Sequence, residues 1–380
     1  MRVLPLLFFL FLLFSCDAED NINENVIPLP EELPTEQKSE YDDMMSSIPN
    51  IGMNQISFMH ISDTHGSDLS IKPMIYALNN CDCDFAIITG DILPSTETIE
   101  YMASSKKPVL LVIGNHDAYD KYGQTGFRKN VMDKVGNPSI IYPNDSACYY
   151  HIDFHKNGHS LRVIALDQYE IDTEGKSSTY YSVISQKQIN WLIDLLNKSE
   201  QFDGIVLLMH QGFGNASIGV RNKTNTNDFI SLFAKNYTKG YYHMGNNNPT
   251  LIPRILNAYI SGENLNGEKY SSGFGKREIE VKTNFSEPHY NFVGYFGGHI
   301  HMDLIEYLPY MKNQLQVLMA YSGEGTGSNF NDLKKSTSGK DSYNFNYNVF
   351  DCKMRELKIY RIGANVKVDG NTRDSISFNI

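Results

Sequence analysis

Five short segments of the sequence place Asp, Asn or His directly after an apolar run. These residues are Asp63 with His65, Asp91, Asn115 with His116, His210, and His299 with His301. Mixed oxygen and imidazole ligands suit Mn, Fe, Ni or Zn, whereas Ca and Mg favour oxygen ligands. The residue types therefore predict a transition-metal site, provided that the fold brings the five segments together.

The apolar runs before these residues are interpreted as β-strands, at residues 55–61, 85–88, 109–113, 205–209 and 292–296. Helices are predicted at residues 71–79 and 96–104, so strand, polar residues and helix alternate early in the chain. Such an alternation indicates βαβ units and an α/β fold, in which the strand ends converge along one edge of the sheet. The polar residues of all five segments would then meet there.

The ligands of this edge are numerous enough for two metal ions. A carboxylate can bridge two ions, and Asp91 is the expected bridge because it stands alone on its strand end. Two ions about 3.5–4 Å apart activate a shared water and clamp a phosphoryl group for in-line attack. The chemistry that follows is hydrolysis of a phosphate ester.

The combination of Asp63-x-His65, Gly90-Asp91, Gly114-Asn115-His116-Asp117, His210 and Gly298-His299-x-His301 resembles the calcineurin-like metallophosphoesterase family. The resemblance implies a four-layer αββα sandwich of two mixed β-sheets flanked by helices. It implies that Asp63, His65, Asp91 and His301 hold one ion and that Asp91, Asn115, His210 and His299 hold the other. A metal-bound hydroxide would attack the phosphorus, His116 would protonate the leaving oxygen or steady the transition state, and Asp117 would orient His116.

One departure from the family narrows the metal chemistry. Purple acid phosphatases carry a tyrosine ligand three residues after the bridging aspartate, and this chain has Pro94 there. No tyrosinate–iron centre is implied. The two expected ions are divalent or trivalent, and the candidates are Mn, Fe, Zn and Ni. The alternative function is a membrane-tethered recognition protein that retains the metal site without turnover.

The sequence is compatible with either a phosphate monoester or a phosphate diester as the substrate. A monoesterase needs additional cations or donors for the third phosphoryl oxygen, and Arg128, Arg221 and Arg254 qualify by residue type alone. The net charge is −11, and the sequence has no long basic run, which disfavours binding to a nucleic-acid backbone. The oligomeric state is not indicated by the sequence.

The N-terminus carries the features of an export signal. Arg2 precedes a short apolar run that ends in Ser15 and Cys16, so residues 1–15 are predicted to be a signal peptide. The end of this run resembles a bacterial lipoprotein processing site, with Cys16 as the lipidated residue; an ordinary signal peptide is the alternative. Residues 16–53 are interpreted as a flexible tether, which predicts a cell-envelope protein in the periplasm or at the cell surface.

Residues 54–364 are predicted to form one catalytic domain, followed by a tail at residues 365–380. Within the domain, residues 211–290 are rich in Asn, Gly, Tyr and Ser and are interpreted as a long insertion, either a substrate-selecting lid or a solvated decoration. Further strands are predicted at 148–154, 161–166, 314–321, 343–350 and 356–362. Further helices are predicted after a Ser185–Gln188 capping box and at 228–234 and 251–260.

The remaining cysteines and histidines are interpreted as structural. Cys81, Cys83, Cys148 and Cys352 lack the spacing of a zinc knuckle and are expected to be buried thiols. The same interpretation is given to His60, His151, His155, His159, His243 and His289.

Overall fold

The computed structural model describes residues 35–119, 123–170, 184–212, 251–272, 277–299, 304–307, 315–318, 343–364, 367–368, 371–372 and 375–380. The predicted signal peptide, the lipidation residue Cys16, the predicted helix at 228–234 and the predicted ligand His301 lie outside these residues. None of the helices searched in these ranges is long and apolar enough to cross a membrane.

The first sheet carries the first three predicted site strands side by side. In the described chain it has the order β16-β13-β12-β1-β2-β3. Its parallel strands are β1 (Gln55–Ile61), β2 (Phe85–Ile88) and β3 (Val109–Leu111). Its antiparallel strands are β12 (Asn344–Asp351), β13 (Glu356–Gly363) and β16 (Ser375–Asn379).

The second sheet carries the other two site strands and has the order β10-β11-β9-β6-β5-β4 in the described chain. The strands β5 (His159–Ala165), β6 (Gly204–Gln211), β9 (Phe292–Gly298) and β11 (Leu315–Leu318) run parallel. The edge strands β4 (Tyr150–Lys156) and β10 (Leu304–Tyr307) are antiparallel to their neighbours. Both sheets are therefore mixed.

The main core lies between the two sheets and is rich in aromatic rings. Phe58 of the first sheet packs edge-on against Phe296 of the second, with ring centroids 5.0 Å apart. Phe85 stacks on Phe154 of the second sheet at 4.1 Å. Such pairs add to the hydrophobic gain from burial and fix the spacing of the sheets. The two sheets face one another as the resemblance implied.

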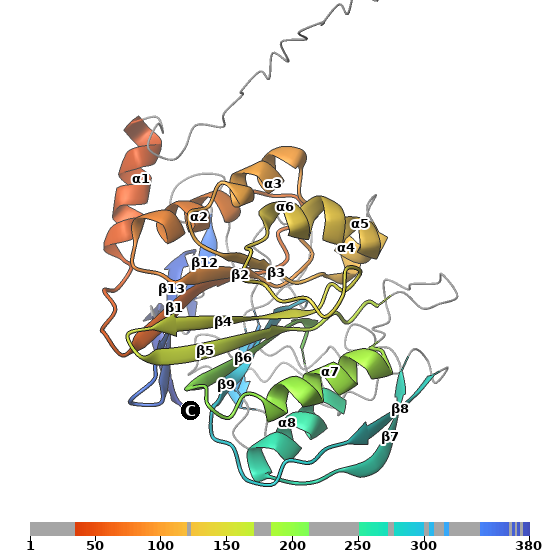
Figure 1. Ribbon diagram of the computed structural model, residues 1–380. Coiled ribbons are helices and arrows are strands. Elements are labelled where there is room, and N and C mark those ends of the chain that lie inside the picture. Colours follow the sequence, from red (N-terminus) through yellow and green to blue (C-terminus); the bar gives the residue numbers. More distant parts are fainter. Residues whose placement is uncertain are drawn as a thin grey trace, which may run out of the picture.

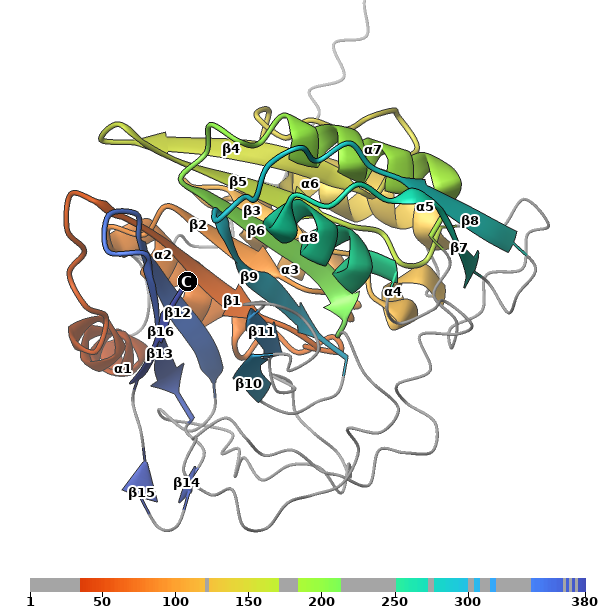
Figure 2. The same cartoon turned by 90° about the horizontal axis from the view of Figure 1, so that it is seen from below.

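Helices cover the outer faces of both sheets and complete four layers. Figure 1 shows α2 (Ile71–Asn80) and α3 (Thr96–Ala103) on the first sheet, and α7 (Gln186–Asn197) and α8 (Leu251–Ser261) on the second. Figure 2 shows α7 and α8 over β5, β6 and β9. Along β6, Val206 and Leu208 belong to the core between the sheets, while Ile205 and Leu207 belong to the core under α7 and α8. This alternation is the two-residue period of a strand buried on both faces.

Short elements complete the described chain. After β3 come α4 (Asn115–Tyr119), α5 (Gly123–Phe127), a π-helical stretch (Arg128–Met132) and α6 (Asp133–Val135). The strands β7 (Asn266–Ser272) and β8 (Arg277–Lys282) form a hairpin, and β14 (Lys367–Val368) pairs with β15 (Asn371–Thr372). The predicted tail thus contains β16, the edge strand of the first sheet.

Packed structure extends into the range expected to be a flexible tether and into the range interpreted as an insertion. Helix α1 (Thr35–Ser46) lies inside the range expected to be a flexible tether, and its Met44 is buried in the main core. Tyr41 of α1 contacts Tyr76 of α2, with ring centroids 4.7 Å apart. Residues 251–272 and 277–290, expected to belong to the insertion, form α8 and the β7–β8 hairpin in the second core. Helix α8 agrees with the helix predicted at 251–260, whereas α1 has little apolar periodicity and depends on tertiary packing.

The predicted capping box at α7 forms only in part. The Ser185 hydroxyl accepts a hydrogen bond from the Gln188 main-chain nitrogen at 3.1 Å, as an N-cap residue does. The Gln188 side chain bonds instead to both main-chain groups of Asp167, each at 2.8 Å. Gln188 therefore fastens α7 to the end of β5.

Candidate metal centre

Six of the seven predicted metal ligands are described, and they lie at the carboxyl ends of the parallel strands of both sheets. Asp63 and His65 follow β1, Asp91 follows β2, Asn115 begins α4, His210 is in β6 and His299 follows β9. The structure brings these six side chains together; the seventh, His301, lies outside the described residues. The convergence follows from strand direction, since parallel strands end on the same edge.

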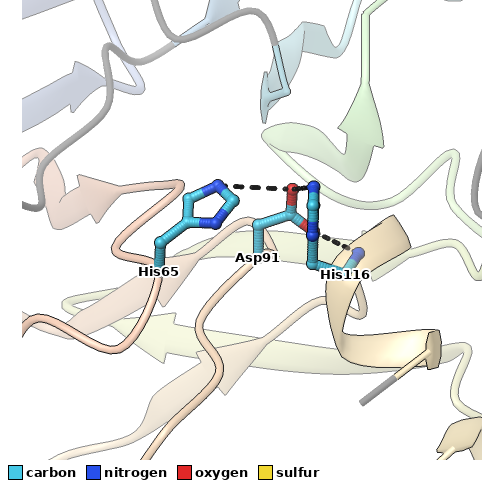
Figure 3. A group of neighbouring side chains, drawn as sticks. All are labelled: His65, Asp91 and His116. Atoms are coloured by element: carbon cyan, nitrogen blue, oxygen red, sulfur yellow. Dashed lines mark hydrogen bonds and ion pairs between the residues drawn. The ribbon is translucent and has the colours of Figure 1, made fainter. Parts of the chain in front are cut away.

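Asp91 lies at the centre of the cluster. Its Oδ2 atom lies 3.2 Å from His210 Nε2, 3.7 Å from His65 Nε2 and 4.0 Å from His116 Nε2. Figure 3 shows the carboxylate between the imidazoles of His65 and His116. The side chain of Asp91 is 1% exposed, and its Oδ2 has no hydrogen-bond partner among the described residues. Its Oδ1 accepts a hydrogen bond from the His116 main-chain nitrogen at 2.8 Å, which holds the carboxylate in place.

Asn115 joins the second group of ligands. Its Oδ1 lies 3.1 Å from His210 Nε2 and 3.0 Å from His299 Nδ1. The ligand atoms of Asp91, His210 and His299 all lie within 4.8 Å of one another, as do those of Asp91, His65 and His116. The two groups share Asp91, which is the arrangement that a bridging carboxylate requires.

The ring of His210 is oriented for metal binding. Its Nδ1 lies 2.6 Å from the carbonyl oxygen of Thr89, which can only accept, so this nitrogen carries the proton. The lone pair of Nε2 then faces two further acceptors, Asp91 Oδ2 and Asn115 Oδ1. Three acceptor atoms directed at one another need a cation between them. Metal-ligating histidines commonly donate their other N–H to a carbonyl in this way, so the residues fit a metal ion.

The electrostatics of the site also favour positive charge. Burial lowers the pKa of His210, but the negative charges of Asp91 and Asp63 outweigh burial and raise it to about 9. Burial raises the pKa of Asp91, and the charges of His210, His116 and His65 outweigh it and hold that pKa below its usual range. A proton on His210 occupies the place that a metal cation would take.

The ligand loops are held in a strained backbone conformation. Positive φ angles occur at Asp63 (55°), His65 (45°), Asp91 (53°) and His299 (73°), a region that residues other than glycine rarely adopt. Hydrogen bonds between the loops hold this conformation, from Asp63 N to Gly90 O at 3.0 Å and from His65 N to Asp91 O at 2.9 Å. Backbone strain of this kind concentrates at functional sites.

Two glycines of the sequence motifs allow the ligands to approach closely. A Cβ atom on Gly114 would lie 2.2 Å from both the main-chain nitrogen and Oδ1 of Asp91. A Cβ atom on Gly298 would lie 1.8 Å from Ser62 Oγ and 2.2 Å from Asp63 Oδ2. Any larger residue at either position would displace a predicted ligand.

His116 and Asp117 are both at the site, but their relationship differs from the expectation. His116 is half exposed, and its ring centroid lies 4.8 Å from that of His65. Asp117 is fully buried and accepts hydrogen bonds from the main-chain nitrogens of Ile92, Leu93 and Gly114, at 2.9, 3.0 and 2.9 Å. In the described part of the chain it makes no hydrogen bond to the His116 ring. Its carboxylate holds the loops of Asp91 and Asn115 instead.

The arginines proposed as phosphate ligands are engaged elsewhere. Arg128 bonds Asp133 at 2.7 Å and lies 3.2 Å from the centroid of the Tyr142 ring. Arg254 forms ion pairs with Glu263 and Glu268 at 2.6 and 2.7 Å. Arg221 lies outside the described residues. Arg128 and Arg254, which qualified by residue type alone, are therefore both engaged in ion pairs with neighbouring carboxylates.

Two residues at the site were not predicted from the sequence. Tyr169 is buried, its ring centroid lies 6.2 Å from that of His210, and its hydroxyl has no hydrogen-bond partner in the described chain. Gln211 Nε2 lies 3.4 Å from His299 Nε2. The signal was present in the sequence, because both follow an apolar strand as the predicted ligands do.

The fold and the site define an α/β sandwich with a cluster of metal-ligating side chains at the strand ends. The chain belongs to the calcineurin-like phosphoesterase family, whose sequence model matches residues 56–303. The family is one of phosphoesterases, and the described site offers groups of side chains that could hold a metal ion. No curated protein matches the sequence.

Several solved structures resemble the chain weakly. NAD nucleotidase (NadN) of Haemophilus influenzae is 12% identical, with a TM-score of 0.41 over 84% of this chain and 53% of its own. A 5'-nucleotidase precursor of Thermus thermophilus is 12% identical, with a TM-score of 0.34 over 85% and 54%. Vps29 of Chaetomium thermophilum is 11% identical, with a TM-score of 0.32 over 86% and 99%. The chain thus spans about half of the length of the two nucleotidase chains. Its assignment to the family rests on the match to the family's sequence model alone.

Proposed function

We propose that the protein hydrolyses phosphate esters at a dinuclear metal centre bridged by Asp91. One observation carries the proposal: the buried Oδ2 of Asp91 lies 3.2–4.0 Å from imidazoles of three separate chain segments and has no hydrogen-bond partner in the described chain. A buried carboxylate oxygen without a donor is costly unless a cation approaches it. The ligand set suits Mn, Fe, Zn or Ni, because its donors are imidazole, carboxylate and amide groups.

The ligands divide between the two ions as the family pattern implies. Asp63, His65, Asp91 and His301 would hold one ion, and Asp91, Asn115, His210 and His299 the other. Bound ions would supply an activated water and neutralise charge on the phosphoryl oxygens. The chain contributes a preformed set of ligands, because its strained loops and interstrand hydrogen bonds are in place before any substrate arrives.

The proposed role of His116 is to donate a proton to the leaving oxygen. Its side chain is 51% exposed, whereas His210 is fully buried, so His116 is the histidine that an entering ester can reach. Its main chain is fixed on Asp91 Oδ1, which directs the ring towards the bridging carboxylate. General acid catalysis by a positioned histidine commonly contributes about 10²–10⁴-fold to the rate.

The test is hydrolysis of 4-nitrophenyl phosphate and bis(4-nitrophenyl) phosphate by metal-loaded protein at neutral pH. We expect turnover with at least one of Mn, Fe, Zn or Ni, loss of turnover after chelation, and recovery when metal is added. The relative rates on the two compounds distinguish a monoesterase from a diesterase. Metal-loaded protein that is inert on both would contradict the proposal and favour the recognition protein.

Export and lipid anchoring are proposed on the sequence alone. A charged residue, a short apolar run and Cys16 support a lipoprotein signal. The test is fractionation of cells that express the full chain or its Cys16→Ala variant. We expect the full chain in the membrane fraction and the variant outside it; identical distribution of the two would contradict anchoring at Cys16.

A further inference from the structure

A second group of metal-ligating side chains lies at the opposite end of the sheets from Asp91. His159 begins β5, Asp203 immediately precedes β6, and Cys352 immediately follows β12. The catalytic cluster lies at the carboxyl ends of β5 and β6, so this group lies at their amino ends. It also joins the two sheets, because β12 belongs to the first sheet and β5 and β6 to the second.

The three donor atoms are close enough to share one ion. A ring nitrogen of His159, a carboxylate oxygen of Asp203 and the Sγ of Cys352 all lie within 4.8 Å of one another. His159 Nδ1 lies 3.5 Å from Asp203 Oδ2. Zinc–ligand bonds of about 2.0–2.3 Å place tetrahedral ligands roughly 3.3–3.8 Å apart, so only a small contraction is required.

The hydrogen bonds around the group orient its donors inward. His159 Nε2 lies 3.3 Å from the Asn54 Oδ1 acceptor, which places the ring proton on Nε2 and leaves a lone pair on Nδ1. That lone pair faces the carboxylate of Asp203, whose Oδ2 is held by the Ser160 main-chain N–H at 2.8 Å. Such a nitrogen and a carboxylate oxygen attract each other only with a proton or a metal cation between them. Fixing a histidine ligand through its second nitrogen is the usual arrangement in metal sites.

The chemistry of Cys352 argues against a nucleophile. The thiol is buried, whereas a nucleophile must be reached by its substrate. A Cys-His-Asp nucleophilic triad is therefore disfavoured. A coordinated metal ion deprotonates a thiol outright. The guanidinium of Arg355 donates to the main-chain oxygen of Asp203 and offsets part of the negative charge.

We propose that His159, Asp203 and Cys352 form a zinc site that joins the two sheets. Imidazole, carboxylate and thiolate supply three of the four ligands that zinc takes, and water completes the tetrahedron. The site would stabilise the folded chain by mass action, because its ligands come together only on folding.

Cobalt substitution separates this site from the catalytic centre. No predicted catalytic ligand carries sulfur, so a thiolate-to-cobalt absorption band reports only on cysteine ligands. We expect metal-free full-length protein titrated with Co²⁺ to develop this band, and added Zn²⁺ to remove it. The band should be absent in Cys352→Ser and reduced in Asp203→Asn, and it should persist in Cys148→Ser, a buried thiol outside the group. Circular dichroism confirms that each variant is folded.

A second readout is stability at fixed zinc concentration. Zinc should raise the melting temperature of an Asp91→Ala variant, whose catalytic centre is impaired, and the rise should disappear in Asp91→Ala/Cys352→Ser. Two results would overturn the proposal. One is a cobalt titration of the folded wild type without a thiolate band; the other is a band that persists unchanged in Cys352→Ser.

Discussion

His210 Nε2 lies 3.2 Å from Asp91 Oδ2, while the Nδ1 of the same ring lies 2.6 Å from the carbonyl oxygen of Thr89. One imidazole from the second sheet thus contacts both the Asp91 carboxylate and Thr89, the residue that follows β2 of the first sheet. The carbonyl contact fixes the proton on Nδ1 and leaves Nε2 for a metal ion. The packing of the two sheets is therefore also what sets the geometry of the site.

Removal of His210 should remove metal and activity together. His210→Ala deletes a ligand at the centre of the cluster, so we expect metal content and ester hydrolysis to fall in parallel, measured by elemental analysis and by release of nitrophenol. The exposed His155→Ala variant is the control and should retain both. Full metal content in His210→Ala would show that His210 is no ligand.

Removal of His116 should separate binding from turnover. His116→Ala leaves the predicted ligands intact, so metal content should be unchanged while kcat falls by about 10²–10⁴-fold. The loss should be larger for an alkyl phosphate than for a nitrophenyl phosphate, since the poorer leaving group depends more on protonation. An equal loss on both substrates would assign His116 another role.

A methyl group at Gly298 should displace Asp63. The added Cβ would lie 2.2 Å from Asp63 Oδ2, well inside contact distance, so Gly298→Ala should lower metal content and activity without unfolding the chain. Gly52→Ala is the matched control, because its Cβ meets the Gln55 side chain at an ordinary 3.5 Å. A fully loaded and active Gly298→Ala protein would contradict the observed approach.

Tyr169 should respond to removal of its hydroxyl differently from other buried tyrosines. The Tyr169 hydroxyl has no hydrogen-bond partner in the described chain, so Tyr169→Phe should leave the stability of metal-free protein unchanged or raise it by about 1 kcal/mol. Tyr150 is the comparison, because its buried hydroxyl donates to the carbonyl oxygen of Leu111 at 3.0 Å. Tyr150→Phe should cost about 1–2 kcal/mol in urea unfolding. Equal losses would show that the Tyr169 hydroxyl is satisfied.

Asp167 should make the metal-free protein less stable as pH rises. Burial, followed by the charge of Glu170, raises the pKa of Asp167 to about 7, above its value of about 3.9 in an unfolded chain. Between about pH 4 and pH 7 the folded state keeps a proton that the unfolded state releases, so rising pH favours unfolding by at most about 4 kcal/mol. Asp167→Asn should lack this part of the pH dependence. Parallel stability profiles for wild type and variant would contradict the shift.

The clustering of the predicted ligands could be foreseen from the sequence wherever such a residue follows a strand. The sequence shows five apolar strands that are followed by Asp, Asn or His, namely β1, β2, β3, β6 and β9. Because these strands run parallel within each sheet, the residues that follow them lie at the same edge. The role of Asp117 was not predictable, because its three donors come from the main chains of Ile92, Leu93 and Gly114, and no sequence pattern records a main-chain contact. Tyr169 was missed because an isolated tyrosine after a strand more often packs in a core.

The fold was predictable where periodicity is strong and was missed where packing decides. The strand ranges at β1 and β2 agree with the structure, since β1 alternates apolar with polar residues as a strand does and β2 is a short apolar run. Helix α1 carries few apolar residues, and Met44 and Tyr41 become informative only once the core that receives them is known. The group of His159, Asp203 and Cys352 was invisible for the same reason, because it spans three distant segments.

Anomalous diffraction from crystals of the Mn²⁺-loaded protein tests the central claim most directly. The claim is that the Asp91 carboxylate lies between two metal ions. We predict two anomalous peaks about 3.5–4 Å apart, one beside His65 and one between His210 and His299, with Asp91 in contact with both. A loaded and active crystal with no peak next to Asp91 would contradict the account.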